Sequence, residues 1–370
     1  MRLHRHAAVA AAALTAVALT AGPASAAPND PPYAQQYGPQ QVRAERAWAT
    51  STGVGTVIAV IDSGVDLSHA DLAGKLVPGA TFVGCTTSCG NGDWKGPDGV
   101  GQEADAHGTH VSGIAAAATR NGIGMAGVAR DAKVMPVKVL EDGSGSFQDI
   151  ASGIRYAADN GADVINMSLG ATQGVQALVL TGVITDVQDA ITYAVSKDVA
   201  VIVAAGNDGV PLCNTPAFDF GAMCVVATDK REAKAAYSSG GVDPELLTVS
   251  APGGSLLPIC GEDIISTVPA GTSRSGAACG YGTDYDEYAG TSMAAPHVAG
   301  VAALLAAQGR SAQGIYDALT STARQPGTEV RGVFEPVFGY GIVDAAAAVA
   351  SPGAVVSTTT KGKGNGGRQK

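Results

Sequence analysis

The chain has 370 residues, of which 46% are hydrophobic and 5% aromatic, and its formal net charge at pH 7 is −10. This negative charge argues against a nucleic-acid-binding protein, because such proteins normally carry a basic surface. The length allows one large domain or two, and the 50 glycines favour a compact fold of small, closely packed elements.

The first 26 residues combine a charged start with an apolar stretch. Arg2 and Arg5 precede a run of alanine, valine and leucine, and the small residues Ala24, Ser25 and Ala26 end the segment. This order predicts a secretory signal peptide over residues 1–26 and therefore a secreted, extracellular protein. We expect no membrane anchor, because no other stretch is long and apolar enough to cross a bilayer.

After this segment, short apolar runs alternate with segments of helical character. The runs expected to form strands are residues 56–64, 132–140, 162–170, 199–207, 223–228 and 246–253. The segments expected to form helices are residues 110–119, 147–161, 185–198 and 291–308. Buried strands that alternate with helices predict an α/β fold with a mainly parallel central sheet and helices on both faces. The last residues, 351–370, are glycine-rich and basic, and we expect them to be disordered.

Three of the predicted strands end in polar residues, namely Asp62, Ser168 and Asn207. In parallel α/β sheets, ligands bind beyond the carboxyl ends of the strands. Chemistry is therefore expected at this edge of the sheet. A cap for the following turn stays open for Asp62, as does an ordinary turn role for Asn207.

Ser292 stands at the start of an alanine-rich helix, in the stretch "GTSMAAPHVAG". Its neighbours are small, so its hydroxyl is approachable, and a helix N-terminus favours negative charge nearby. Pro296 cannot donate a hydrogen bond to the carbonyl of Ser292, four residues earlier. Capping of a buried helix remains the alternative role for this serine.

These residues together supply the parts of a serine nucleophile site. A nucleophilic serine needs a base, the base needs an orienting carboxylate, and the oxyanion that forms needs hydrogen-bond donors. The candidates are Ser292 as nucleophile, His107 as base, Asp62 as carboxylate and Asn207 as donor.

The other histidines have plainer interpretations. His107 and His110 are spaced as metal ligands on a helix can be, but no third ligand lies nearby in the sequence. We expect His110 to pack behind the site, and His69 and His297 to be structural. Nucleotide binding is excluded, because the glycines of "GVGTVIAV" precede the strand, whereas a phosphate-binding loop follows one.

Six cysteines remain after residue 26, an even number that suggests disulfides in an oxidising compartment. Many pairings are open to six cysteines, and the sequence alone cannot choose among them. Pairing of sequence neighbours would join Cys85 to Cys89, Cys213 to Cys224, and Cys260 to Cys279.

The motifs "VIDSGVD", "HGTHVSG", "AAGND" and "GTSMAAPHVAG", in this order, resemble those of the subtilisin-like serine peptidases. Residues 29–48 and 306–312 resemble the thermitase-like branch of that family. The similarity extends over roughly residues 29–350, and we therefore expect one peptidase domain over residues 27–350. It implies the three-layer fold of the family and the four roles assigned above, with the backbone N–H of Ser292 as a second oxyanion donor.

The resemblance also implies a groove for peptide or protein substrates. Its two edges would be Gly143, Ser144 and Gly145 on one side and Ser168, Leu169 and Gly170 on the other, pairing with an extended peptide. Asn214, Thr215 and Pro216 fall where the family builds the floor of its main specificity pocket, and the family often has a cis-proline there. Asn214 would narrow that floor, and broad specificity with a hydrophobic preference is expected.

A structural calcium ion is a further implication of the resemblance. Asp71 and Asn121 match the family's high-affinity loop, and Asp30 matches a ligand from the N-terminal arm. Backbone carbonyls of Ile123 and Met125 would complete an oxygen shell. Ordinary turn roles for these residues stay open.

Three features depart from the family pattern. The sequence leaves little room after Ala27 for an inhibitory pro-segment, residues 83–105 form an insertion before His107, and residues 256–288 enlarge a hairpin before Ser292. We expect a monomeric endopeptidase. A narrow-specificity processing peptidase remains an alternative, as does, with less support, an inactive secreted scaffold.

Overall fold

The structure is a computed structural model that describes residues 27–353, apart from residues 86, 97–98, 172–174, 176–181 and 183–184. The predicted signal peptide lies outside the described residues, and so do residues 354–370 of the predicted tail. Within the described residues, no helix combines the length and the apolar character that a membrane crossing requires.

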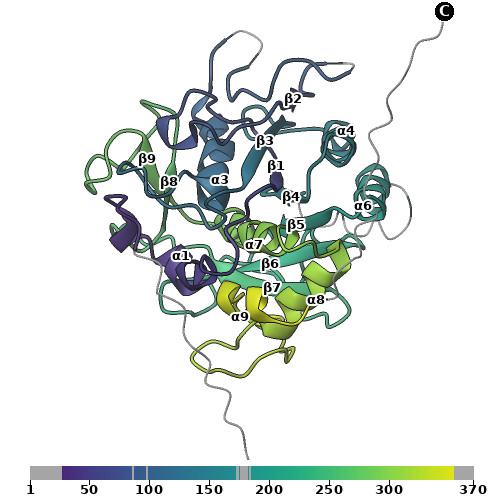
Figure 1. Ribbon diagram of the computed structural model, residues 1–370. Coiled ribbons are helices and arrows are strands. Elements are labelled where there is room, and N and C mark those ends of the chain that lie inside the picture. Colours follow the sequence, from purple (N-terminus) through teal and green to yellow (C-terminus); the bar gives the residue numbers. More distant parts are fainter. Residues whose placement is uncertain are drawn as a thin grey trace, which may run out of the picture.

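A parallel sheet of seven strands forms the centre of the described chain (Figure 1). Its strand order is β2-β3-β1-β4-β5-β6-β7, and every pairing in it is parallel. The strands are β1 (Val57–Asp62), β2 (Ala80–Thr81), β3 (Lys133–Lys138), β4 (Val164–Met167), β5 (Ala200–Ala204), β6 (Ala222–Thr228) and β7 (Leu247–Pro252). The predicted parallel α/β sheet is confirmed.

Helices cover both faces of this sheet. Successive side chains of a strand point to opposite faces, so Ile58 and Val60 of β1 pack into one hydrophobic core while Ala59 and Ile61 pack into the other. The helices are α1 (Tyr37–Gln41), α2 (Ala44–Ala47), α3 (Ala106–Ala116), α4 (Phe147–Asp159), α6 (Asp186–Ser196), α7 (Thr291–Ala306), α8 (Ala312–Thr322) and α9 (Ala345–Ala350). Short 3₁₀ turns are η1 (Tyr33–Gln35), η2 (Ala70–Leu72) and η3 (Glu103–Asp105).

The composition of each helix explains its place. α3 and α7 are rich in alanine and glycine and are buried on nearly all sides in the first core. α4 and α6 are amphipathic and bury one face each in the second core, and Figure 1 draws them close together beside the sheet. Ser146 caps α4 by accepting a hydrogen bond from the N–H of Asp149.

The bounds of one predicted helix matter for the site. The apolar pattern predicts a helix over residues 110–119, whereas α3 runs from Ala106 to Ala116. Ala117 leaves the helix with an extended backbone, and the chain then turns toward Asn121. His107 therefore lies in the first turn of the helix rather than before it.

A smaller antiparallel pair lies beside α3. Strands β8 (Ile264–Thr267) and β9 (Tyr285–Tyr288) form the hairpin that residues 256–288 enlarge. Ser266 and Thr267 donate hydrogen bonds to backbone carbonyls of α3, at His110 and Thr109 respectively. The hairpin thus holds the helix that carries His107 from its outer side.

The six cysteines form three disulfides. They join Cys85 to Cys89, Cys213 to Cys224, and Cys260 to Cys279. Pairing of sequence neighbours is therefore confirmed.

Candidate active site

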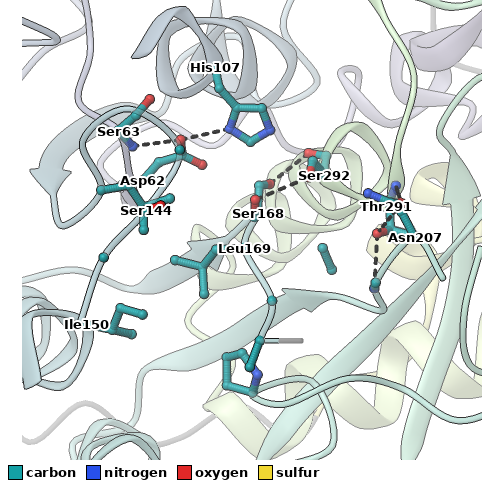
Figure 2. A pocket seen from close by; sticks show the side chains of 18 of the residues that line it. Asp62, Ser63, His107, Ser144, Ile150, Ser168, Leu169, Asn207, Thr291 and Ser292 are labelled. Atoms are coloured by element: carbon teal, nitrogen blue, oxygen red, sulfur yellow. Dashed lines mark hydrogen bonds and ion pairs between the residues drawn. The ribbon is translucent and has the colours of Figure 1, made fainter. Parts of the chain in front are cut away.

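A pocket of about 470 Å³ opens at the carboxyl edge of the sheet (Figure 2). Its lining includes Asp62, His107, Asn207 and Ser292, which come from four separate segments of the chain. The polar residues at the ends of strands and the start of α7 thus meet in one place, as expected for a parallel α/β sheet.

Asp62 and His107 form a direct pair. The distance from Oδ1 of Asp62 to Nδ1 of His107 is 2.8 Å, and Asp62 is completely buried while 27% of the His107 side chain is exposed. Burial lowers the pKa of His107, but the negative charge and the hydrogen bond of Asp62 outweigh it and raise that pKa above its usual value of 6.5. One ring nitrogen is therefore held by a carboxylate, and within the described part of the chain no hydrogen bond occupies the other.

Gly108 lets helix α3 approach the turn after β1. A Cβ atom on Gly108 would lie 2.2 Å from the carbonyl oxygen of Gly64, so only glycine fits there. Ser63 stabilises the packing of α3 against this turn. Its Oγ accepts from the N–H of Gly108 at 3.0 Å and donates to the carbonyl of Asp105 at 2.9 Å. His107 reaches Asp62 because the helix backbone sits directly against this turn.

Ser292 is the second residue of α7 and does not cap the helix. The cap position is Gly290, and no side chain caps this helix end. Pro296 leaves the carbonyl of Ser292 without a helical partner, and the hydroxyl of Ser168 donates to that carbonyl at 2.7 Å. In return, Oγ of Ser292 donates to the carbonyl of Ser168 at 3.2 Å (Figure 2). The capping interpretation of Ser292 is therefore wrong.

Asn207 is oriented by the residue before Ser292. Its Oδ1 accepts from the backbone N–H of Thr291 at 2.9 Å and from the Thr291 hydroxyl at 3.0 Å. The amide nitrogen is thereby directed away from Thr291 and remains a donor at the pocket, whose lining includes Asn207. Sequence reasoning missed Thr291, although its position next to Ser292 in the chain was a usable signal.

The expected groove edges also line the pocket. Gly143, Ser144 and Gly145 lie on one side, and Ser168, Leu169 and Gly170 on the other. Part of the apolar lining comes from residues that the sequence analysis did not single out, namely Leu140, Phe147, Ile150, Val187 and Ala204.

The structure places Asn214 behind the pocket lining. Pro216 lines the pocket and follows a cis peptide bond, whereas Asn214 is outside the lining set and 3% exposed. Its amide donates to the carbonyl of Ala171 at 3.3 Å and to Asp208 at 2.5 Å, and it lies against Gly206. The amide is turned toward these partners because a buried polar group needs hydrogen bonds.

The residues expected to bind calcium also come together. Asp30 accepts from the N–H groups of Arg120 and Asn121, and Asp71 accepts from the Asn121 amide at 2.7 Å and from the N–H of Met125 at 2.8 Å. The N–H of Ile123 donates to Oδ1 of Asn121. Burial raises the pKa of Asp71 to about 6. Among the described residues, no cluster of three or more His, Cys, Asp or Glu side chains is arranged to hold a metal.

The remaining histidines are packed as expected. His110 is buried and stacks on Tyr288 with ring centres 4.3 Å apart, and burial lowers its pKa to about 3. His69 accepts from the N–H of Asp71, and His297 is buried with Nδ1 2.8 Å from the carbonyl of Met293. His110 therefore packs behind the site, with Nε2 3.0 Å from the carbonyl of Ile264.

Comparison with known proteins agrees with this geometry. Residues 53–341 match the model of the subtilase family. The chain belongs to the subtilase family. It is 42% identical over 298 residues to thermitase of Thermoactinomyces vulgaris, a match that covers 80% of this chain and 91% of thermitase. The thermitase-like branch expected from the sequence is confirmed, and the chain is a subtilisin-like serine endopeptidase.

Two further relatives extend the comparison. The chain is 40% identical to an extracellular protease of Xanthomonas campestris, with 82% of this chain matched to 52% of that protein. Among solved structures, a protease from Pseudoalteromonas arctica superposes with a TM-score of 0.71 at 35% identity, covering 87% of this chain and 98% of the other. The three-layer subtilase fold is thus confirmed.

Proposed function

We propose that this subtilase is an extracellular endopeptidase that cleaves peptide bonds through a Ser292–His107–Asp62 triad and an acyl-enzyme intermediate. The observation that carries the proposal is the 2.8 Å pair of Asp62 and His107 at the rim of a pocket that Ser292 and Asn207 also line. Extracellular location is supported by the signal-peptide pattern, by the three disulfides and by the extracellular relative.

The hydroxyl of Ser292 would have to leave its present hydrogen bond to begin the reaction. It donates to the Ser168 carbonyl, and turning about its side-chain bond would direct its proton to the free Nε2 of His107. His107 would accept that proton as Oγ attacks the substrate carbonyl, and would later give it to the leaving amine. Asp62 would stabilise the imidazolium through the bond to Nδ1.

The oxyanion would be held by two donors. One is the side-chain amide of Asn207, whose oxygen is fixed by Thr291. The other is the backbone N–H of Ser292, at the second position of α7, where helical N–H groups have no partner within the helix. The first donor is held by its bonds to Thr291 and the second by the helix, so little reorganisation would be needed when negative charge develops.

The substrate would lie extended between the two pocket edges. Residues 143–145 and 168–170 would pair with its backbone. The apolar lining around Ile150 and Leu169 favours a hydrophobic side chain in the pocket. A peptide-library digest tests this, since a narrow processing peptidase would cut at a few related sites and the broad enzyme at many.

Calcium would bind at the loop of residues 120–125, which contacts the N-terminal arm through Asp30. Asp30 and Asp71 offer carboxylates, and Asn121, Ile123 and Met125 offer amide or carbonyl oxygens, the ligands that calcium prefers. The donor set fits the ion, and Asp71 is a completely buried carboxyl whose charge a cation would stabilise. The ion would hold the arm to the domain and take no part in the chemistry.

The triad is tested by active-site labelling with a serine-directed phosphonate. The wild type should be labelled at Ser292 and lose activity in proportion. Ser292→Ala should stay folded, resist labelling and lose about 10⁴- to 10⁶-fold in turnover. Near-normal hydrolysis by folded Ser292→Ala enzyme would refute the assignment, and an unlabelled wild type would support the inactive scaffold.

A further inference from the structure

Lys138 places an ammonium group inside the protein, beside the strand that carries Asp62. It is the last residue of β3, and its backbone is in register with Asp62 at the end of β1. The residue is 0% exposed, and its side chain is one of the largest that is fully buried. A buried charge is costly unless it is paired and hydrogen-bonded, so the partners of this lysine are informative.

The partners of Lys138 come from three segments around the active site. Its Nζ donates to the carbonyl of Ser63 at 2.8 Å and to the carbonyl of Trp94 at 3.4 Å. It also lies 3.6 Å from Oδ1 of Asp105, which is itself completely buried. The lysine therefore joins the turn after β1 to two points of the insertion of residues 83–105, namely Trp94 and Asp105 directly before α3.

These contacts lead directly to the catalytic pair. The N–H of Ser63 donates to the same Oδ1 of Asp62 that faces His107, at 2.7 Å. Ser63 is also bonded to the carbonyl of Asp105 and to the N–H of Gly108 in the first turn of α3. One ammonium group thus fixes the residue that orients the Asp62 carboxylate.

A second path leads to the substrate groove. Oδ1 of Asp105 accepts from the backbone N–H of Asp142 at 3.0 Å. Asp142 immediately precedes Gly143, Ser144 and Gly145, which form one edge of the pocket. The Lys138–Asp105 pair therefore connects the catalytic pair to that edge.

We propose that Lys138 is a positioning residue for the Asp62–His107 pair and, through Asp105, for the 143–145 edge of the groove. The proposal rests on the triad described above. The insertion before His107 contributes to it, because the carbonyl of Trp94 is one of the ammonium's acceptors.

The charge of Lys138 has an effect that packing alone would not have. Lys138 places its positive charge beside the buried carboxylate of Asp105 and next to Ser63, the residue that binds Asp62. The titratable groups that act on or beside His107 are Asp62 and, on α3 itself, His110. Loss of a nearby positive charge favours the charged imidazolium and raises the pKa of His107. The acid limb of the pH–activity profile reports this pKa.

The test compares Lys138→Met with Lys138→Arg. Both are assayed for kcat and KM across pH, normalised to the active sites titrated with the phosphonate. In Lys138→Met, kcat should fall roughly 10- to 100-fold and the acid limb of kcat/KM should move up by roughly half to one pH unit, with a smaller change in KM. Lys138→Arg keeps the charge and should keep the acid limb at its wild-type position.

Lys75→Met is the matched control. Lys75 is another buried lysine, but its contacts lie near the start of β3, whereas Lys138 is at the end of that strand. The backbone carbonyl of Lys75 accepts from the N–H of Val134, and its Nζ donates to the carbonyl of Arg130 at 2.5 Å. Its loss should lower thermal stability without moving the acid limb. If Lys138→Met does not fold, Lys138→Met combined with Asp105→Asn removes both charges of the pair and serves in its place. That double variant should still show the lowered kcat.

An acid limb at the wild-type position in Lys138→Met overturns the proposal, whatever the yield of active enzyme. A double variant whose kcat per titrated active site equals that of the wild type would also overturn the proposal. Failure of the triad itself is distinguishable, because it would appear as activity in Ser292→Ala. A dead Ser292→Ala beside an unperturbed Lys138→Met would refute only the role of Lys138.

Discussion

Asp62 and Asp71 are both completely buried carboxylates, but they differ in their partners. Asp62 faces His107 and the N–H of Ser63 through Oδ1, while its Oδ2 has no hydrogen-bond partner among the described residues. Asp71 has both oxygens occupied, by the amide of Asn121 and the N–H of Met125. A histidine can take and release a proton near neutral pH, and amides cannot. The first region is therefore suited to proton transfer and the second to holding segments of chain together.

The largest effect should come from Asp62→Asn. Turnover should fall about 10⁴-fold, because the amide no longer favours the imidazolium that forms during catalysis. Asp62 holds the pKa of His107 above 6.5, so activity of the wild type should be lost as the pH falls through a value above 6.5. In Asp62→Asn the residual acid limb should move to lower pH.

The measurement is kcat/KM against pH for both enzymes, with the melting temperature as a check on folding. Asp71→Asn is the matched control, since it makes the same chemical change in the other buried carboxyl. It should leave the acid limb in place. An acid limb that shifts in Asp71→Asn and stays fixed in Asp62→Asn would contradict the comparison.

A smaller effect is expected from Asn207→Ala. This change removes a donor that meets charge only in the transition state, so turnover should fall about 10²- to 10³-fold while KM changes little. Thr291→Val is a useful companion, because it removes one of two hydrogen bonds to Asn207 and should cost less. Steady-state kinetics decide the matter: a variant that loses affinity and keeps turnover would place Asn207 in substrate binding.

Removal of calcium should affect stability and leave the chemistry intact at first. An ion that binds only the native state stabilises it by about 2.7 kcal/mol at a hundredfold excess over Kd. Chelation should therefore lower the melting temperature and expose the N-terminal arm to self-cleavage, and Asp71→Ala should reproduce this and ignore added calcium. An unchanged melting temperature after chelation of the wild type would remove the case for the ion.

The smallest effect should follow loss of the Cys85–Cys89 disulfide. Only four positions separate these cysteines, and a short loop restricts the unfolded chain least, so the cost should be about 2 kcal/mol at most. Replacement of both by serine should leave kcat/KM near the wild-type value. Denaturant unfolding should rank this pair below Cys260–Cys279, whose separation is 19; the reverse order would show that native packing decides the ranking.

The sequence by itself was sufficient for the sheet and for the residues that meet at the candidate active site. Side chains that become buried form recognisable apolar runs in the sequence. Runs such as residues 56–64 and 199–207 therefore predict strands before the neighbouring strands in the sheet are known. The polar residues that end these strands, Asp62 and Asn207, could then be assigned to one edge, because parallel strands share it. Family motifs around His107 and Ser292 completed the group.

Only the tertiary structure decided how these residues are held. The Ser168 hydroxyl satisfies the carbonyl that Pro296 leaves free, Thr291 orients Asn207, Asn214 turns away from the pocket, and Lys138 fastens Ser63. Most of these contacts join residues many positions apart in the chain, and no local pattern encodes them. They depend on strand register and on the close approach of α3 and α7 to the sheet edge, because a hydrogen bond forms only where folding brings donor and acceptor within about 3 Å.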